Sequence, residues 1–191
     1  MSGAAVDTDR LAVVLADSDE SARSNMKRAL RDWGAAVHEA SDEQQAIALL
    51  KSAPDLLITD LRLAGGGSGL RLATLASTLR PSPIVVAVSD QATPVEAFQL
   101  AQAGTAAYLP KPLDLATFVA TIESVLAQPP CIEPQIAMQV GRVPYFEVLA
   151  RVRRTMLEQA LAQAGGNRIR AAERLKLTRQ AVQQMIRSFA T

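Results

Sequence analysis

Five side chains that could do chemistry together follow apolar runs in the first two thirds of the sequence: Asp17, Asp19, Asp60, Ser89 and Lys111. Carboxylates and backbone carbonyls form a hard-oxygen site that suits Mg²⁺, which takes its remaining ligands from water and phosphate. In such a site Asp60 would attack a phosphoryl group, and Mg²⁺ and Lys111 would neutralise the developing charge. Each residue alone has a simpler interpretation, such as a helix cap for Asp19. Their joint placement is what predicts phosphoryl chemistry.

Apolar runs that alternate with helical periodicity must position these side chains. The predicted strands are 11–16, 35–38, 56–59, 84–88 and 107–109. The predicted helices are about 20–33, 42–53 with Ser41 as its cap, 70–79, 94–103 and 115–127. Fully apolar strands separated by helices are typical of a parallel sheet covered on both faces. Because parallel strands end at the same edge, where function gathers in such sheets, we expect the active side chains to converge there.

The last part of the chain has the pattern of two short helices joined by a tight turn, 168–175 and a second helix that Thr178 would cap. The second helix keeps one apolar face: Ala181, Val182, Met185, Ile186 and Phe189. Its other face carries donors that suit base edges in a major groove: Arg179, Gln180, Gln183, Gln184 and Arg187. This pattern predicts a helix-turn-helix whose second helix reads DNA, with Arg168 and Thr178 as further contacts. The alternative is a hairpin whose polar face simply meets water.

Charge separates the two ends of the chain. Residues 142–191 hold ten Lys and Arg against three Glu, a net charge of +7. Because the whole chain carries +1, residues 1–141 carry −6. A small basic domain is what binding to a phosphate backbone requires, so the charge favours double-stranded DNA as the partner. The segment also resembles the Fis-type helix-turn-helix of bacterial activators, on Gly165-Gly166-Asn167, Ala171-Ala172 and 179–182.

Residues 10–127 resemble the receiver domain of two-component response regulators. The resemblance implies a flavodoxin-like fold with a five-stranded parallel sheet in the order 2-1-3-4-5, and a histidine kinase as partner. It places Asp60 as the phospho-acceptor and implies that Mg²⁺ is held by Asp17, Asp60 and the backbone carbonyl of Arg62, with Asp19 as a further candidate. Asp60 stands in L-L-I-T-D. The resemblance also implies that Ser89 in V-V-A-V-S and Tyr108 in Y-L-P-K-P are switch residues, and that Lys111 in the latter motif, followed by a cis proline, is the phosphate-binding cation.

Two departures from the receiver pattern leave a second interpretation open. The acid that usually follows Asp17 is Ser18, which should lower the affinity for Mg²⁺. The loop after Asp60 reads A-G-G-G-S-G, which we expect to be flexible beside the site. The receiver could therefore serve dimerisation or ligand sensing without being phosphorylated.

An enzymatic alternative uses the same residues. Asp17-Ser18-Asp19 after an apolar run also resembles the D-x-D motif of haloacid-dehalogenase-type phosphatases, with Asp17 as nucleophile and Asp19 as general acid. The late acidic pair that holds Mg²⁺ in that family is missing, since only Asp90 stands there, and we see no cap domain. We therefore favour a regulator over an enzyme.

Three segments follow from these assignments: a receiver domain at 10–127, a linker at 128–144 with four prolines, and a DNA-binding domain at 145–191. The linker is too short for the ATPase module that separates such domains in some activators, and no G-x-x-x-x-G-K-[ST] motif occurs. This layout resembles the RegA/PrrA/ActR group of regulators. Cys131 in the linker would be a redox-sensitive thiol or, as we favour, an inert side chain.

A long helix at 145–164 is predicted ahead of the DNA-reading pair. Its apolar stripe comprises Phe146, Leu149, Val152, Met156, Leu157, Ala160 and Leu161. The stripe is wider than two short helices would cover, so we expect it to pair with a second subunit as well; core packing alone is the competing interpretation. A homodimer would set two recognition helices about 34–36 Å apart on DNA.

The remaining composition favours a protein of the cytoplasm. No apolar run approaches the ~18 residues of a membrane span, and no secretory signal is visible at the N-terminus. A single cysteine excludes an internal disulfide and fits a reducing compartment.

Overall fold

The computed structural model describes residues 11–90, 92–127 and 136–189. The chain divides into two compact units between residues 130 and 131, and each unit is described by itself. Part of the predicted linker, residues 128–135 with Cys131, lies outside the described residues.

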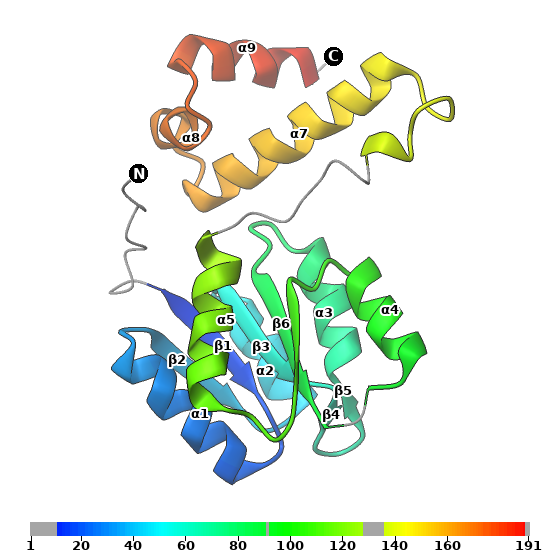
Figure 1. The fold of residues 1–191 in the computed structure, drawn as a ribbon. Coiled ribbons are helices and arrows are strands. Elements are labelled where there is room, and N and C mark those ends of the chain that lie inside the picture. The colour runs from blue at the N-terminus through cyan, green and yellow to red at the C-terminus, as the bar shows by residue number, and fades with distance from the viewer. Residues whose placement is uncertain (1–10, 91, 128–135, 190–191) are drawn as a thin grey trace. The chain divides into compact units, whose positions relative to one another are not determined.

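Five parallel strands form the sheet of the first unit (Figure 1). They are β1 (Ala12–Ala16), β2 (Ala36–Ala40), β3 (Leu56–Asp60), β6 (Ile84–Ser89) and β7 (Ala107–Pro110). Their order is β2-β1-β3-β6-β7, which confirms the predicted order of the five main strands. The register places Thr59 opposite both Ala16 and Ala87, so the carboxyl ends of β1, β3 and β6 lie side by side.

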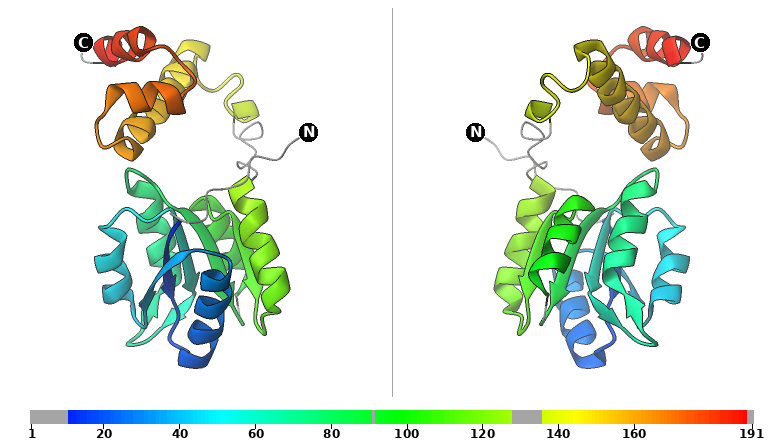
Figure 2. Two further views of the ribbon diagram at one scale, coloured as in Figure 1. Left: turned by 90° about the vertical axis from the view of Figure 1, so that its left-hand side faces the viewer. Right: turned by 90° about the vertical axis from the view of Figure 1, so that its right-hand side faces the viewer.

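Helices cover both faces of this sheet, as the apolar strands require (Figure 2). Alternate strand residues point to opposite faces, so Val13 packs with α1 (Glu20–Asp32) and α5 (Leu115–Ala127). Its neighbour Val14 packs on the other face with α2 (Glu43–Leu50), α3 (Gly69–Thr78) and α4 (Pro94–Gln102). The central strand β3 is buried throughout, which explains why its sequence shows no polar alternation.

The second helix begins one residue later than predicted, and its cap is a different side chain. The predicted cap was Ser41, but Asp42 occupies the cap position and its carboxylate accepts a hydrogen bond from the Gln45 amide at 2.8 Å. Ser41 is instead tied by its backbone carbonyl to the Ala64 amide. The prediction was wrong because both residues favour caps, and only the bridge between Asp42 and Ala64 selects the second.

The glycine-rich loop after Asp60 forms a turn between two short strands. Strands β4 (Arg62–Leu63) and β5 (Gly67–Ser68) form a hairpin with a three-residue loop, in which Gly65 and Gly66 have positive φ. A Cβ on Gly69 would lie 1.9 Å from the carbonyl oxygen of Asp60, so only glycine fits there. Gly65 and Gly66 therefore allow the turn, and Gly69 allows α3 to begin against the backbone of Asp60.

The second unit contains the helices α7 (Tyr145–Gln163), α8 (Arg168–Arg174) and α9 (Arg179–Phe189). Asn167 caps α8, and Thr178 accepts from the Ala181 amide at 3.2 Å, which confirms the predicted cap of α9. Leu157, Ala172 and Val182 form the centre of the small core between the three helices.

Much of the apolar stripe on α7 stays outside that core. Leu157 and Ala160 are buried, whereas Phe146 is 79% exposed and Met156 is 54% exposed.

Among the described residues, no helix is long and apolar enough to cross a lipid bilayer.

Candidate functional site: an acidic pocket and a basic helix pair

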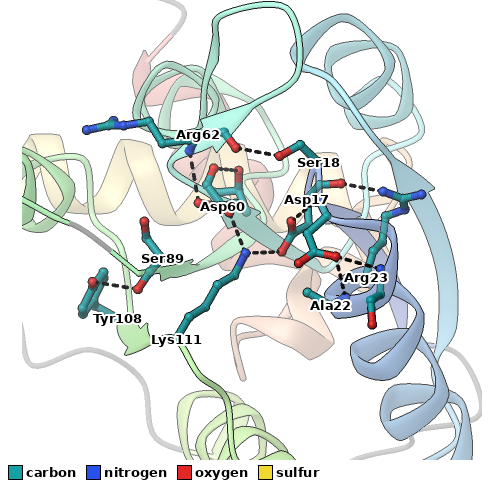
Figure 3. Close-up of polar contacts among 12 residues, drawn as sticks. Asp17, Ser18, Ala22, Arg23, Asp60, Arg62, Ser89, Tyr108 and Lys111 are labelled. Carbon is teal, nitrogen blue, oxygen red and sulfur yellow. Dashed lines mark hydrogen bonds and ion pairs between the residues drawn. The ribbon is translucent and has the colours of Figure 1, made fainter.

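Four predicted site residues meet at the carboxyl edge of the sheet (Figure 3). Asp17 directly follows β1, Asp60 ends β3, Ser89 ends β6 and Lys111 directly follows β7. Asp17 is 0% exposed and Asp60 is 7% exposed. Because charged groups are rarely buried without partners, this edge must supply the compensating contacts.

The ammonium of Lys111 joins the two carboxylates. Its Nζ lies 2.6 Å from Asp60 Oδ2 and 2.8 Å from Asp17 Oδ2. Burial opposes the charge on Lys111, but hydrogen bonds and attraction from Asp17 and Asp60 outweigh it and raise the pKa of the ammonium. The peptide between Lys111 and Pro112 is cis, as the receiver resemblance implied. The pocket therefore holds a fixed cation against two carboxylates.

The backbone on the far side of Asp60 is also fixed. The amide of Arg62 donates to Asp60 Oδ1 at 3.1 Å, and the hydroxyl of Ser18 donates to the Arg62 carbonyl oxygen at 3.2 Å. The structure thus places a hydroxyl, where receivers usually have a second acid, on the carbonyl that was predicted to bind metal.

Asp19 caps its own helix and also lines the cavity beside Lys111. Its Oδ1 accepts from the Ser21 amide at 2.8 Å and the Ala22 amide at 3.1 Å, so it caps α1. These two backbone donors, Ala22 first, lower the pKa of the Asp19 carboxyl. Its own amide donates to Asp17 Oδ1 at 2.8 Å, which orients that buried carboxylate. The contacts of Asp19 among the described residues are those of a helix cap.

The oxygen donors that the pocket offers a cation are Asp17, Asp60 and the Arg62 carbonyl. Mg²⁺ takes only one or two carboxylates from a protein and fills its other positions with water and phosphate oxygens, so this donor set suits it. Within the described ranges, no group of three or more Asp, Glu, His or Cys side chains is placed to hold a metal. The residues therefore fit Mg²⁺ with one charge fewer than a three-acid site would supply.

Ser89 and Tyr108 lie next to this pocket. The Oγ of Ser89 is buried and finds no hydrogen-bond partner among the described residues. The hydroxyl of Tyr108 donates to the backbone carbonyl of Ser89 at 3.1 Å, and the ring is 38% exposed. Because a buried hydroxyl without a partner costs free energy, Ser89 is poised to take a ligand oxygen.

In the second unit, most of the predicted DNA-contacting residues reach solvent. The exposed ones are Arg168, Thr178, Arg179, Gln180, Gln184 and Arg187. Gln183 is half-buried. The structure therefore presents six of the seven side chains on the surface and draws Gln183 inward.

Further residues were not singled out from the sequence. Arg170, Arg174 and Lys176 are exposed on α8 and the turn that follows, and they add cations beside the candidate face. These three residues are among the ten Lys and Arg of residues 142–191, so the net charge of the segment could have pointed to them. The side chain of Arg62 and its partner Glu96 were also missed: Thr93-Pro94-Val95-Glu96 has a capping-box pattern, but no local pattern links Glu96 to Arg62.

Comparisons with known proteins agree with both halves of this description. The profile of the response regulator receiver domain matches residues 13–123, and that of the bacterial regulatory protein, Fis family, matches residues 149–187. Both families are regulatory rather than classical enzyme families.

Two curated regulators are similar to the chain over most of its length. The DNA-binding transcriptional regulator NtrC of Azospirillum brasilense is 30% identical over 171 residues, which are 81% of this chain and 35% of that protein. The transcriptional regulatory protein ZraR of Escherichia coli K12 is 31% identical over 142 residues, 71% of this chain and 32% of that protein. The chain thus spans about a third of the length of these relatives.

Solved structures show the same fold. A response regulator from Burkholderia pseudomallei, with a phosphorylated aspartic acid, calcium ion and citrate, is 23% identical with a TM-score of 0.55; the match covers 90% of this chain and 96% of that chain. The non-phosphorylated HemR receiver domain of Leptospira biflexa is 26% identical with a TM-score of 0.58, covering 63% of this chain and 97% of that one. The chain belongs to the response regulators, with a receiver domain followed by a Fis-family helix-turn-helix domain.

Proposed function

We propose that the protein is a DNA-binding transcriptional regulator controlled by phosphorylation of Asp60, with a histidine kinase as the donor. The observation that carries this proposal is the ammonium of Lys111 at 2.6 Å from Asp60, beside the buried Ser89 hydroxyl that has no partner among the described residues. A cation and a free donor next to a carboxylate suit the charge that a phosphoryl group brings. The action would take place in the cytoplasm, where the DNA lies.

The transfer would proceed at one oxygen of Asp60. That oxygen attacks phosphorus of a phosphohistidine, a P–O bond forms, the P–N bond breaks, and the imidazole leaves and takes up a proton. Lys111 neutralises the phosphoryl oxygens, and the Ser89 hydroxyl donates to one of them. Mg²⁺ held by Asp17, Asp60 and the Arg62 carbonyl would supply further positive charge when bound.

The output would be DNA binding by α8 and α9. The exposed side chains on α9, foremost Arg179 and Gln180, would contact base edges, and the exposed cations of α8 would contact phosphates. The net charge of +7 over residues 142–191 supports this assignment because most nonspecific affinity for DNA is electrostatic.

We further propose that two copies pair through α7. Met156 is 54% exposed and lies on the side of α7 that carries Val148 and Val152. A groove of about 520 Å³ also runs along this helix, between Ile136, Val148, Val152 and Met156. A two-fold dimer would place two α9 helices about one DNA turn apart and would predict a palindromic site.

One observation favours a second candidate, a receiver that works without phosphorylation. The Ser18 hydroxyl donates a hydrogen bond to the Arg62 carbonyl oxygen, and it brings no negative charge that would attract a metal ion. Weak Mg²⁺ binding would slow phosphoryl transfer, and the receiver would then serve dimerisation or ligand sensing.

Mass spectrometry of the intact chain after incubation with acetyl phosphate and Mg²⁺ separates the two candidates. We expect one phosphoryl adduct on the wild type and none on Asp60→Asn. Asp42→Asn is the matched control: asparagine caps helices as well as aspartate does, and Asp42 caps α2 without lining the cavity beside Lys111, so this variant should form the adduct normally. A wild type that never gains mass would support the second candidate. Turnover of an aryl phosphate that is lost in Asp17→Asn but kept in Asp60→Asn would point to a phosphatase instead.

A further inference from the structure

Arg62 links three parts of the receiver. Its amide donates to Asp60 Oδ1 at 3.1 Å, its carbonyl accepts from Ser18, and its guanidinium Nη2 lies 2.6 Å from Glu96 Oε1 on α4. The backbone of this residue therefore lies against the phospho-acceptor, while its side chain reaches the start of a separate helix (Figure 3 shows the backbone contacts).

The two carboxylate oxygens of Glu96 have different partners. Oε2 accepts from both the amide and the hydroxyl of Thr93 at 2.9 Å, and the Glu96 amide donates back to the Thr93 hydroxyl at 3.2 Å. This capping box lies entirely within α4. Oε1 is left for Arg62. If the ion pair opened, the start of α4 would stay capped, so the helix could shift without unwinding.

Packing holds α4 less firmly than the other helices of the receiver. Leu100 is its one buried residue, whereas α1, α2 and α5 each bury two and α3 buries four. Val95 and Phe98 on α4 are each 65% exposed. A helix with so little buried surface is of the kind that moves at low cost in free energy, so a single ion pair can decide its position.

We propose that the ion pair between Arg62 and Glu96 carries the phosphorylation state of Asp60 to α4. The inference rests on the proposed phosphorylation. A phosphoryl group brings about −1.5 to −2 charges to the side chain that the Arg62 amide already contacts. Glu96 offers one negative charge, so the phosphoryl group competes for the guanidinium. Arg62 turns from Glu96 to the phosphoryl oxygens, and α4 is released together with the apolar Val95 and Phe98.

Hydrogen exchange of the α4 amides in the full chain tests this link, with intact mass measured on the same samples. Glu96→Gln keeps an acceptor for the capping box and removes the charge that holds Arg62. In the wild type, acetyl phosphate should speed exchange across residues 95–102 by about threefold, which is what the loss of one exposed ion pair allows. In Glu96→Gln, exchange should already be that fast without phosphate and should not change further.

Arg71→Gln is the matched control. It breaks a different ion pair, in which Arg71 Nε lies 3.2 Å from Oε1 of Glu43 on α2, and it should leave the exchange of the α4 amides unchanged. If the wild type gains the phosphoryl group but α4 exchange stays constant, or if Glu96→Gln behaves like the wild type, the link is overturned while the proposed function stands. If no adduct forms on the wild type, both fail, and the mass measurement identifies that case.

Discussion

The pocket of the receiver and the face of the helix-turn-helix use charge in opposite ways. The pocket holds one cation within 2.8 Å of two buried carboxylates, and each charge has a fixed partner. The face of α8 and α9 displays exposed cations such as Arg170 and Arg179. Removing one of the buried charges leaves its partners buried and unpaired, whereas each exposed charge contributes separately and is screened by salt. We therefore expect single substitutions to have a large effect in the pocket of the receiver. Single substitutions on α8 and α9 should each change the affinity for DNA by a small amount.

The largest expected effect is that of Lys111→Met. Removing the ammonium leaves Asp17 and Asp60 buried without a cation, so we expect the receiver to lose about 3 kcal/mol of unfolding free energy at neutral pH. Urea unfolding followed by tryptophan fluorescence measures this, because Trp33 is the one tryptophan of the chain and lies in the receiver, where its indole donates to Glu123 at 2.9 Å.

A double variant sharpens that result. Adding Asp17→Asn to Lys111→Met removes one of the two unpaired carboxylates and should restore part of the lost stability. If the Lys111→Met receiver were as stable as the wild type, the buried carboxylates would not need the ammonium of Lys111 for stability.

The next largest effect is expected at the recognition helix. Gln180→Ala should cost about 1–3 kcal/mol at a specific site and relax the base preference at one position, because a bidentate amide contact is lost. Gln183→Ala, half-buried in the structure, should cost less. Binding-site selection from random duplexes, followed by titration, compares the two. Equal losses would show that both glutamines read bases.

A smaller effect is expected from Ser18→Asp. A third carboxylate beside Asp17 and Asp60 should raise Mg²⁺ affinity by about tenfold, or about 1.4 kcal/mol. Calorimetric titration of the unphosphorylated chain with Mg²⁺ gives the readout. Ser18→Asn, which adds similar bulk without charge, serves as the control and should leave the affinity near that of the wild type. Unchanged binding in Ser18→Asp would mean that position 18 does not face the cation.

The smallest effect is that of Arg170→Ala. If Arg170 contacts one phosphate, its loss should weaken binding to all duplexes alike and reduce the slope of log affinity against log salt by about 0.9. Stability should change by less than about 0.5 kcal/mol, because the residue is exposed. A sequence-dependent loss would instead make Arg170 a base reader.

Much of the sheet could be predicted because most strand residues are apolar and helical periodicity separates the strands. The convergence of Asp17, Asp60, Ser89 and Lys111 followed from the parallel order alone. What the sequence could not show depends on contacts between distant segments. Asp42, which bridges to Ala64, caps α2 in place of Ser41, and Gly69 packs against the backbone of Asp60. The pair of Arg62 and Glu96 is a contact of the same kind.

The central claim is that phosphorylation of Asp60 changes the affinity for DNA. Fluorescence anisotropy of one labelled duplex, titrated with the full chain before and after acetyl phosphate, tests it most directly. We expect the phosphorylated wild type to bind with a changed affinity and Asp60→Asn to bind alike under both conditions. Equal binding by the phosphorylated and unphosphorylated wild type, with the adduct verified by mass, would contradict the account.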